Sequence, residues 1–136
     1  MFYRVIFSVA MASVALFATD FEDAAIAYKK GDFSKAVVLF TAMCDKGNFV
    51  GCTTLGWMYG NGEGVEKDSL KAEAFYKKAC DGNDALGCAA LGMMYELGDG
   101  VEQDSFKAME FYTKSCDLKE EMGCKNKDKM KIQMAN

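Results

Sequence analysis

Six cysteines dominate the chemistry that this sequence predicts. They form three pairs, each separated by eight residues, that recur every 36 residues: Cys44 and Cys52, Cys80 and Cys88, Cys116 and Cys124. Cysteines in proteins serve as structural disulfides, metal ligands or redox centres. Zinc sites use C-x2-C type spacing and dithiol redox sites use C-x-x-C. Neither spacing occurs here, so the pattern favours structural disulfides over a metal site or a redox site.

The period also selects among the fifteen pairings that six cysteines allow. If the units are equivalent, the pairing must repeat with them, as it does when Cys44 joins Cys52, Cys80 joins Cys88 and Cys116 joins Cys124. Each first cysteine would end one helix and each second would begin the next, as in an antiparallel hairpin of helices. Each bridge closes about nine residues and would stabilise the fold by about 2.5 kcal/mol. Disulfides persist in oxidising compartments, so a secreted or periplasmic protein is predicted.

A repeated pair of helices is predicted to position the cysteines. Residues 55–90 align with residues 91–126 without a gap, which indicates stacked supersecondary units. In both units a leucine and a tyrosine share one helix face, beside a glycine that predicts close helix contact: Leu55, Gly56 and Tyr59; Leu91, Gly92 and Tyr95. The second helices carry apolar stripes at spacings of three and four: Ala72, Phe75, Tyr76 and Ala79; Ala108, Phe111, Tyr112 and Ser115.

Seven helices and no strands are predicted, at about 20–30, 33–45, 50–60, 69–80, 84–96, 105–117 and 122–134. Asp68 and Asp104 are predicted N-caps. The loops before them contain glycines that predict positive φ angles: Gly62, Gly64, Gly98 and Gly100. The fold class is therefore all-α. One repeat domain is expected over residues 19–136, with units at about 19–54, 55–90 and 91–126 and a capping helix to 136.

The first 18 residues have the composition of a secretory signal. The apolar run Val5–Phe17 is short of the roughly 20 residues that span a bilayer, and small residues permit cleavage after Ala15 or Ala18. An uncleaved membrane anchor is the alternative. No stable membrane span is expected once residues 1–18 are removed, and the remaining chain is expected to be a monomer.

Charge and composition exclude several classes of function. The formal net charge is −4 and becomes −5 without Arg4, so nucleic acid is not an expected partner. The chain has no histidine, which excludes Ser-His-Asp catalysis, Cys-His catalysis and histidine-ligated metals. No S-x-x-K, S-D-N or K-T-G motif is present, and Ser69 and Ser105 precede lysines at the wrong spacing. The catalytic residues, if any exist, are unknown, and no cofactor or metal is predicted.

The pattern L-G-x-M-Y-x-x-G-x-G-V-x-x-D-x-x-K-A-x-x-F-Y-x-K-x-C at 55–80 and 91–116 resembles the Sel-one-like repeat, a relative of the tetratricopeptide repeat. With the added C-x7-C, the chain is similar to the secreted Helicobacter cysteine-rich proteins. That resemblance implies an exported right-handed solenoid of antiparallel helix pairs with one disulfide per repeat. Members of that branch carry names that class them provisionally as β-lactamases or penicillin-binding proteins.

Two functions are therefore expected as alternatives. The first is a scaffold that binds a protein or a peptidoglycan-like fragment through a concave groove. Candidate groove residues are positions that differ between aligned units: Trp57 against Met93, Asn61 against Leu97, and Gly60 against Glu96. Trp57 is the only tryptophan, a residue enriched at binding hot spots, although it could instead pack against the next unit. The second is a weak β-lactamase, which only the resemblance implies.

Overall fold

The computed structural model describes residues 20–136, and the predicted signal segment 1–18 lies outside them. Helical residues 20–29 come first in this range. Six further helices follow: α2 (Phe33–Asp45), α3 (Phe49–Asn61), α4 (Ser69–Asp81), α5 (Ala85–Leu97), α6 (Ser105–Asp117) and α7 (Glu121–Ala135). Between residues 20 and 136 there is no β-strand. The seven predicted helices are confirmed, each to within two residues at either end.

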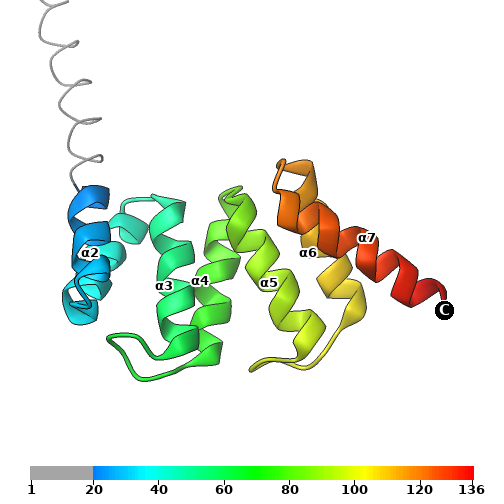
Figure 1. The fold of residues 1–136 in the computed structure, drawn as a ribbon, viewed down its shortest axis with the longest axis horizontal. Coiled ribbons are helices and arrows are strands. Elements are labelled where there is room, and N and C mark those ends of the chain that lie inside the picture. The colour runs from blue at the N-terminus through cyan, green and yellow to red at the C-terminus, as the bar shows by residue number, and fades with distance from the viewer. Residues whose placement is uncertain (1–19) are drawn as a thin grey trace, which may run out of the picture.

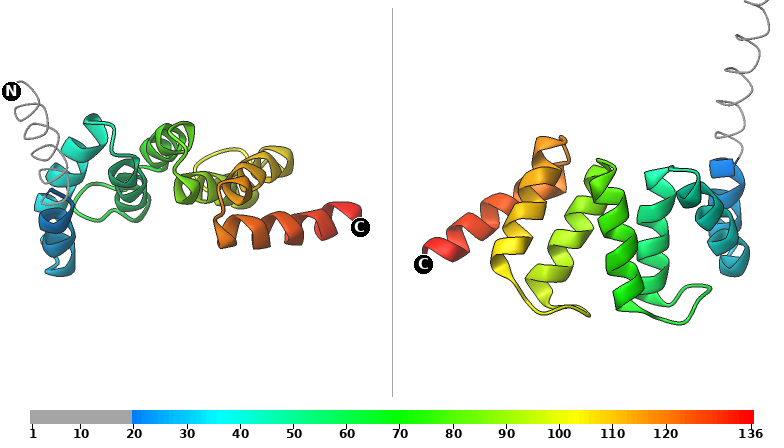
Figure 2. Two further views of the ribbon diagram at one scale, coloured as in Figure 1. Left: turned by 90° about the horizontal axis from the view of Figure 1, so that it is seen from above. Right: turned by 180° about the vertical axis from the view of Figure 1, so that it is seen from behind.

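The helices form antiparallel pairs that stack side by side along one axis (Figure 1). We call residues 20–29 with α2 the first pair, α3 with α4 the second, and α5 with α6 the third. The helix contacts run mainly between sequence neighbours, and the first helices α3 and α5 also touch, as do α5 and α7. The turned views in Figure 2 show the same succession. The predicted all-α solenoid is confirmed. Within residues 20–136, no helix has the length and apolar character needed to cross a bilayer.

Aspartates fix where the second helices begin. The Asp68 carboxylate accepts a hydrogen bond from the Lys71 backbone N–H at 3.1 Å, and Asp104 accepts one from Lys107 at 3.0 Å. Each carboxylate satisfies a backbone donor that the first helical turn leaves free. Both predicted N-caps are confirmed.

Glycines shape the loops between the helices of a pair. Gly62 and Gly98 end α3 and α5 with φ angles of 69° and 67°. Gly64 has a φ angle of 72°, and a Cβ there would lie 2.5 Å from the carbonyl carbon of Phe33. The loop of the second pair therefore rests directly on the start of α2, which ties neighbouring pairs together.

One disulfide joins the second helix of each pair to the helix that follows it, with the pairing that the sequence predicts. The Cα–Cα distances are 4.7, 4.5 and 4.4 Å for Cys44–Cys52, Cys80–Cys88 and Cys116–Cys124. A glycine precedes the second cysteine of each bridge. At Gly51 a Cβ would lie 2.8 Å from the Met43 Cβ, and at Gly87 it would lie 2.7 Å from the Ala79 Cβ. The helices cross so closely at each bridge that a side chain at the glycine would clash.

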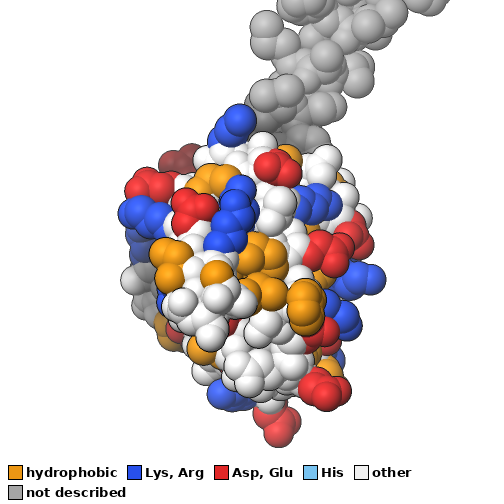
Figure 3. Space-filling model, turned by 90° about the vertical axis from the view of Figure 1, so that its right-hand side faces the viewer, with side chains coloured by type: hydrophobic (Ala, Val, Ile, Leu, Met, Phe, Trp, Pro, Cys, Tyr) orange, Lys and Arg blue, Asp and Glu red, His pale blue; other side chains and the backbone are white. Residues whose placement is uncertain are grey.

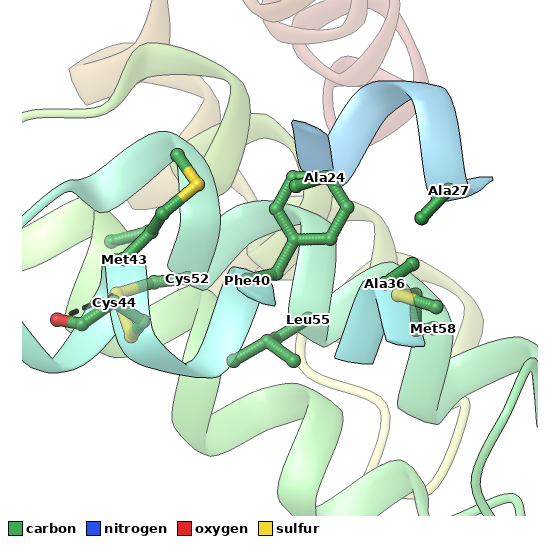
Figure 4. Close-up of a cluster of buried hydrophobic side chains, with 10 residues drawn as sticks. Ala24, Ala27, Ala36, Phe40, Met43, Cys44, Cys52, Leu55 and Met58 are labelled. Carbon is green, nitrogen blue, oxygen red and sulfur yellow. Dashed lines mark hydrogen bonds between the residues drawn. A yellow bond between two sulfur atoms is a disulfide. The ribbon is translucent and has the colours of Figure 1, made fainter. Parts of the chain in front are cut away.

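Small and flexible apolar side chains fill the space between pairs. Figure 4 shows Phe40 of α2 between Ala24 of the first helix and Leu55 of α3. Met58 of α3 and Met94 of α5 occupy equivalent positions in the repeat and are 0% and 7% exposed. The buried residues form three clusters along the stack, and Tyr59 and Tyr95 each pack against two of them.

α7 covers the C-terminal end of the stack. Its Met130 is buried against Ala108 and Tyr112 of α6. The outer face of this end carries charged side chains around a central group of hydrophobic ones (Figure 3). Ile132 of α7 contributes to the exposed apolar surface of the molecule, with 66% of its area accessible. The predicted capping helix is thus present but not uniformly polar.

Candidate functional site

A groove of about 530 Å³ runs along the first helices of the second and third pairs, α3 and α5. This volume falls in the range of about 300–1,000 Å³ that is typical of ligand sites. The wall from α3 consists of Thr53, Thr54, Trp57, Gly60 and Asn61. The wall from α5 consists of Leu86, Ala90, Met93, Met94 and Leu97. Tyr28, Ser69, Ala72, Tyr76, Asp99 and Met122 complete the lining.

Exposed apolar side chains make this groove unusual for a protein surface. Trp57 is 53% exposed, Leu86 47%, Met93 38% and Leu97 69%. Trp57 and Met93 occupy equivalent positions 36 residues apart, so the repeat itself aligns them along the groove. Contiguous exposed apolar surface of this kind marks interaction sites. Asp99 is the one charged side chain among the described residues that line it.

The structure brings five of the six candidate groove positions together, Gly60 and Leu97 among them. Trp57, Asn61 and Met93 line the groove, whereas Glu96 does not. The Glu96 carboxylate instead accepts hydrogen bonds from the Tyr112 hydroxyl at 2.6 Å and from the Lys129 ammonium at 3.0 Å. Burial alone would raise the pKa of Glu96, but these two donors outweigh it and lower the pKa. Glu96 faces the next helices of the stack because its position on α5 is turned toward α6 and α7.

A tyrosine that the sequence assigns to an apolar core stripe reaches the groove. Tyr76 is 7% exposed, and its ring lies against Gly56, where a Cβ would be 2.6 Å from ring carbons. Tyr112 lies in the same way against Gly92, at 2.7 Å. The two tyrosines are therefore equivalent in place as well as in sequence.

The partners of the two hydroxyl groups differ. Tyr112 donates to Glu96, but the equivalent of Glu96 in the second pair is Gly60, which has no side chain. Within residues 20–136 no residue forms a hydrogen bond with the Tyr76 hydroxyl, which borders the groove. The alignment of Gly60 with Glu96 is the feature of the sequence from which the unpaired Tyr76 hydroxyl could have been predicted.

Burial raises the pKa of Tyr76 to about 12, and the nearby Asp99 carboxylate adds to the rise. At neutral pH its hydroxyl is therefore a hydrogen-bond donor and is not ionised to act as a base. Tyr28 lies at the other edge of the groove and donates to Glu63 at 2.8 Å. That hydrogen bond, with burial as the smaller cause, raises the pKa of Tyr28.

The remaining polar groups of the groove do not form a catalytic pair. Thr53 donates to the Asp84 carboxylate, which also caps α5 by accepting from the Gly87 N–H. Ser69 lines the groove, yet no lysine of the described chain lines it with Ser69. The serine nucleophile of an S-x-x-K enzyme has such a lysine beside it. Within residues 20–136, Cys, Asp and Glu side chains nowhere gather in a group of three that could hold a metal ion.

Comparison with known families identifies the repeat. The sequence model of the Sel1 repeat matches residues 25–48, 51–84 and 85–120. The chain belongs to the Sel1 repeat family. The first matched segment is the short helix pair before α3, and the other two contain the second and third pairs. Sel1 and tetratricopeptide-like repeats generally mediate protein interactions.

A curated relative comes from Helicobacter pylori. The chain is 39% identical over 73 residues to the Helicobacter pylori protein named "Putative beta-lactamase HcpD", covering 51% of this chain and 24% of that protein. It thus spans about a quarter of the length of this curated relative.

Solved structures show the same Sel1 architecture. Helicobacter pylori cysteine rich protein B superposes with a TM-score of 0.64 at 37% identity, covering 66% of this chain and 68% of that chain. The Escherichia coli protective antigen c5321, described as an SLR fold, gives a TM-score of 0.78 at 26% identity, covering 86% and 26%. These similarities confirm the predicted family and its disulfide-stabilised scaffold.

Proposed function

We propose that this protein is an exported scaffold that binds a partner protein through the groove between α3 and α5. The observation that carries the proposal is the alignment of Trp57 and Met93 along one groove, both exposed and apolar. Burying such side chains against a partner releases water from apolar surface, at about 25 cal/mol for each Å². A rigid solenoid can supply this surface because its groove is already formed before binding.

The composition of the groove favours a polypeptide over a cell-wall fragment. Glycan ligands present many hydroxyl groups, each of which needs a polar partner when it leaves water. Of the described side chains lining the groove, most are apolar and one is charged. Apolar side chains of a peptide fit such a surface better than a sugar ring does.

The disulfides support export. Six cysteines, all paired within residues 20–136, are expected in an oxidising compartment and not in the cytosol. The cysteine-rich Helicobacter pylori relatives agree with a location outside the cytoplasm. Passage into the periplasm or out of the cell, directed by residues 1–18, is part of this proposal.

The name of the Helicobacter pylori relative raises β-lactam hydrolysis as a second function, but no observation at the groove favours it. We expect no covalent adduct and no product when the oxidised protein is incubated with penicillin and followed by intact mass. A stable adduct would identify a nucleophile, and peptide mapping would locate it.

Replacing Trp57 with alanine tests the binding function. Peptides selected from a random displayed library on the oxidised protein serve as probes, and calorimetric titration gives their Kd. Loss of a hot-spot tryptophan weakens binding by about 30-fold or more, whereas the melting temperature should hardly change because Trp57 is half exposed.

Phe106→Ala is the matched control. Phe106 is an aromatic residue that is 78% exposed on α6 and is not among the groove residues. Its loss should leave the Kd unchanged. Binding by Trp57→Ala with the Kd of the wild type would refute a role of Trp57 in recognition. A large drop in the melting temperature of this variant would show that Trp57 serves packing.

A further inference from the structure

The third helix pair contains a filled version of a site that is open in the second pair. In the third pair the buried Tyr112 hydroxyl donates to the Glu96 carboxylate at 2.6 Å, and Lys129 balances the charge at 3.0 Å. In the second pair Tyr76 takes the place of Tyr112 and Gly60 takes the place of Glu96. The chain thus shows what an occupant of the open site must offer, namely an oxygen that accepts from the tyrosine.

The open site differs from the filled one in charge. Met93 stands where Lys129 stands one repeat later, so no cation from that position faces the groove. Asp99 borders the groove instead and lies close enough to Tyr76 to act on its hydroxyl. An anionic ligand would meet a negative charge with no balancing lysine. The acceptor that fits is therefore a neutral oxygen.

Resting on the proposed function, we infer that the Tyr76 hydroxyl donates a hydrogen bond to a backbone amide carbonyl of the bound polypeptide. The carbonyl oxygen takes the place that the Glu96 carboxylate takes in the next pair. Gly60 determines access to this site, because any long polar side chain there would occupy it. Trp57 and Leu97 form the apolar wall that receives the side chain next to the carbonyl.

Burial makes this single hydrogen bond selective. The Tyr76 side chain is 7% exposed and borders the groove, so a ligand that covers its hydroxyl without offering an acceptor would remove this donor from water and leave it unpaired. An N-acetyl amide of a cell-wall glycan offers the same oxygen. Its flanking hydroxyl groups, however, would face the apolar wall of Trp57 and Leu97 without partners.

Two substitutions and one matched control test the inference. Tyr76→Phe keeps the ring that packs on Gly56 and removes only the hydroxyl. Gly60→Glu recreates in the second pair the carboxylate that fills the third. Tyr59→Phe is the control, because Tyr59 lies on α3 but is not among the groove residues, so this change removes a tyrosine hydroxyl outside the groove. The probes are the library-selected peptides, and a muramyl dipeptide glycan fragment is titrated beside them.

Loss of one neutral hydrogen bond should raise the peptide Kd about two- to twelvefold in Tyr76→Phe. Gly60→Glu should raise it more than tenfold, while Tyr59→Phe stays within about twofold of the wild type. The inference is overturned if Tyr76→Phe and Gly60→Glu bind like the wild type while Trp57→Ala does not, and the proposed function then stands. If only the glycan fragment binds, or no peptide is selected, the polypeptide ligand and the proposed function both fail.

Discussion

Replacing Gly56 with alanine tests how closely α3 approaches α4. The added Cβ would lie 2.6 Å from the Tyr76 ring carbons, whereas carbon atoms normally approach no nearer than about 3.5 Å. The ring or the helix must therefore shift by about 0.9 Å. Overpacking of this size costs about 1–3 kcal/mol. The higher helix propensity of alanine opposes this cost and stabilises the helix by about 1 kcal/mol relative to glycine.

Gly60→Ala on the same helix separates these two effects. It receives the same type of helix stabilisation, but its Cβ meets only the Ala72 Cβ at 3.7 Å. The difference in unfolding free energy between the two variants isolates the steric cost, and we expect Gly56→Ala to be less stable by about 1–3 kcal/mol. Urea unfolding of the oxidised proteins measures this difference, provided that the slope with urea is the same in both. Equal stability of the two variants would refute the close packing of Tyr76 on Gly56.

Two further predictions concern the bridges and the partly buried carboxylate of Glu96. Loss of either crosslink should lower the unfolding free energy by about 2.5 kcal/mol. Removing Cys80 and Cys88 together should cost more than removing Cys116 and Cys124, because Cys80 and Cys88 are buried and their loss also leaves a cavity, whereas Cys116 and Cys124 are only partly buried. Urea unfolding of the two double variants measures this difference, and a larger loss for Cys116 and Cys124 would contradict the prediction. Since the folded state lowers the pKa of Glu96, its ionised form stabilises the fold above its ordinary pKa of 4.5, and this contribution is lost as the pH falls below that value. The stability advantage of wild type over Glu96→Gln near pH 7 should therefore vanish in acid, and a constant advantage across the titration would show that the carboxylate charge is irrelevant.

Much of the fold follows from the sequence because its signals are local and repeated. Asp68 and Asp104 mark helix starts through contacts within three residues, and Gly62 and Gly98 mark the preceding helix ends through the backbone itself. The period of 36 residues then chooses the disulfide pairing, a choice that a single cysteine-rich unit would not have allowed.

The groove was harder to predict because it depends on contacts between pairs. Aligning the units singled out Trp57, Asn61 and Met93 as variable, but it could not show that Glu96 turns toward Tyr112 on the next helix. The sequence places Tyr76 in an apolar stripe. Its hydroxyl becomes a candidate for ligand binding only because Gly60, which replaces Glu96 in the second pair, offers it no acceptor. Spacing along one helix predicts which face a residue lies on, not which neighbour reaches it.

The bridges also bear on how the chain matures. Every bridge joins two cysteines that are consecutive among the six and separated by eight residues. If the chain is oxidised in the order in which it emerges from a translocation pore, each first cysteine meets its correct partner before the next cysteine emerges. Native pairing then requires an oxidant but no isomerase to reshuffle mispaired bonds. Because each bond staples only adjacent helices, units could also be gained or lost in evolution without leaving an orphaned thiol.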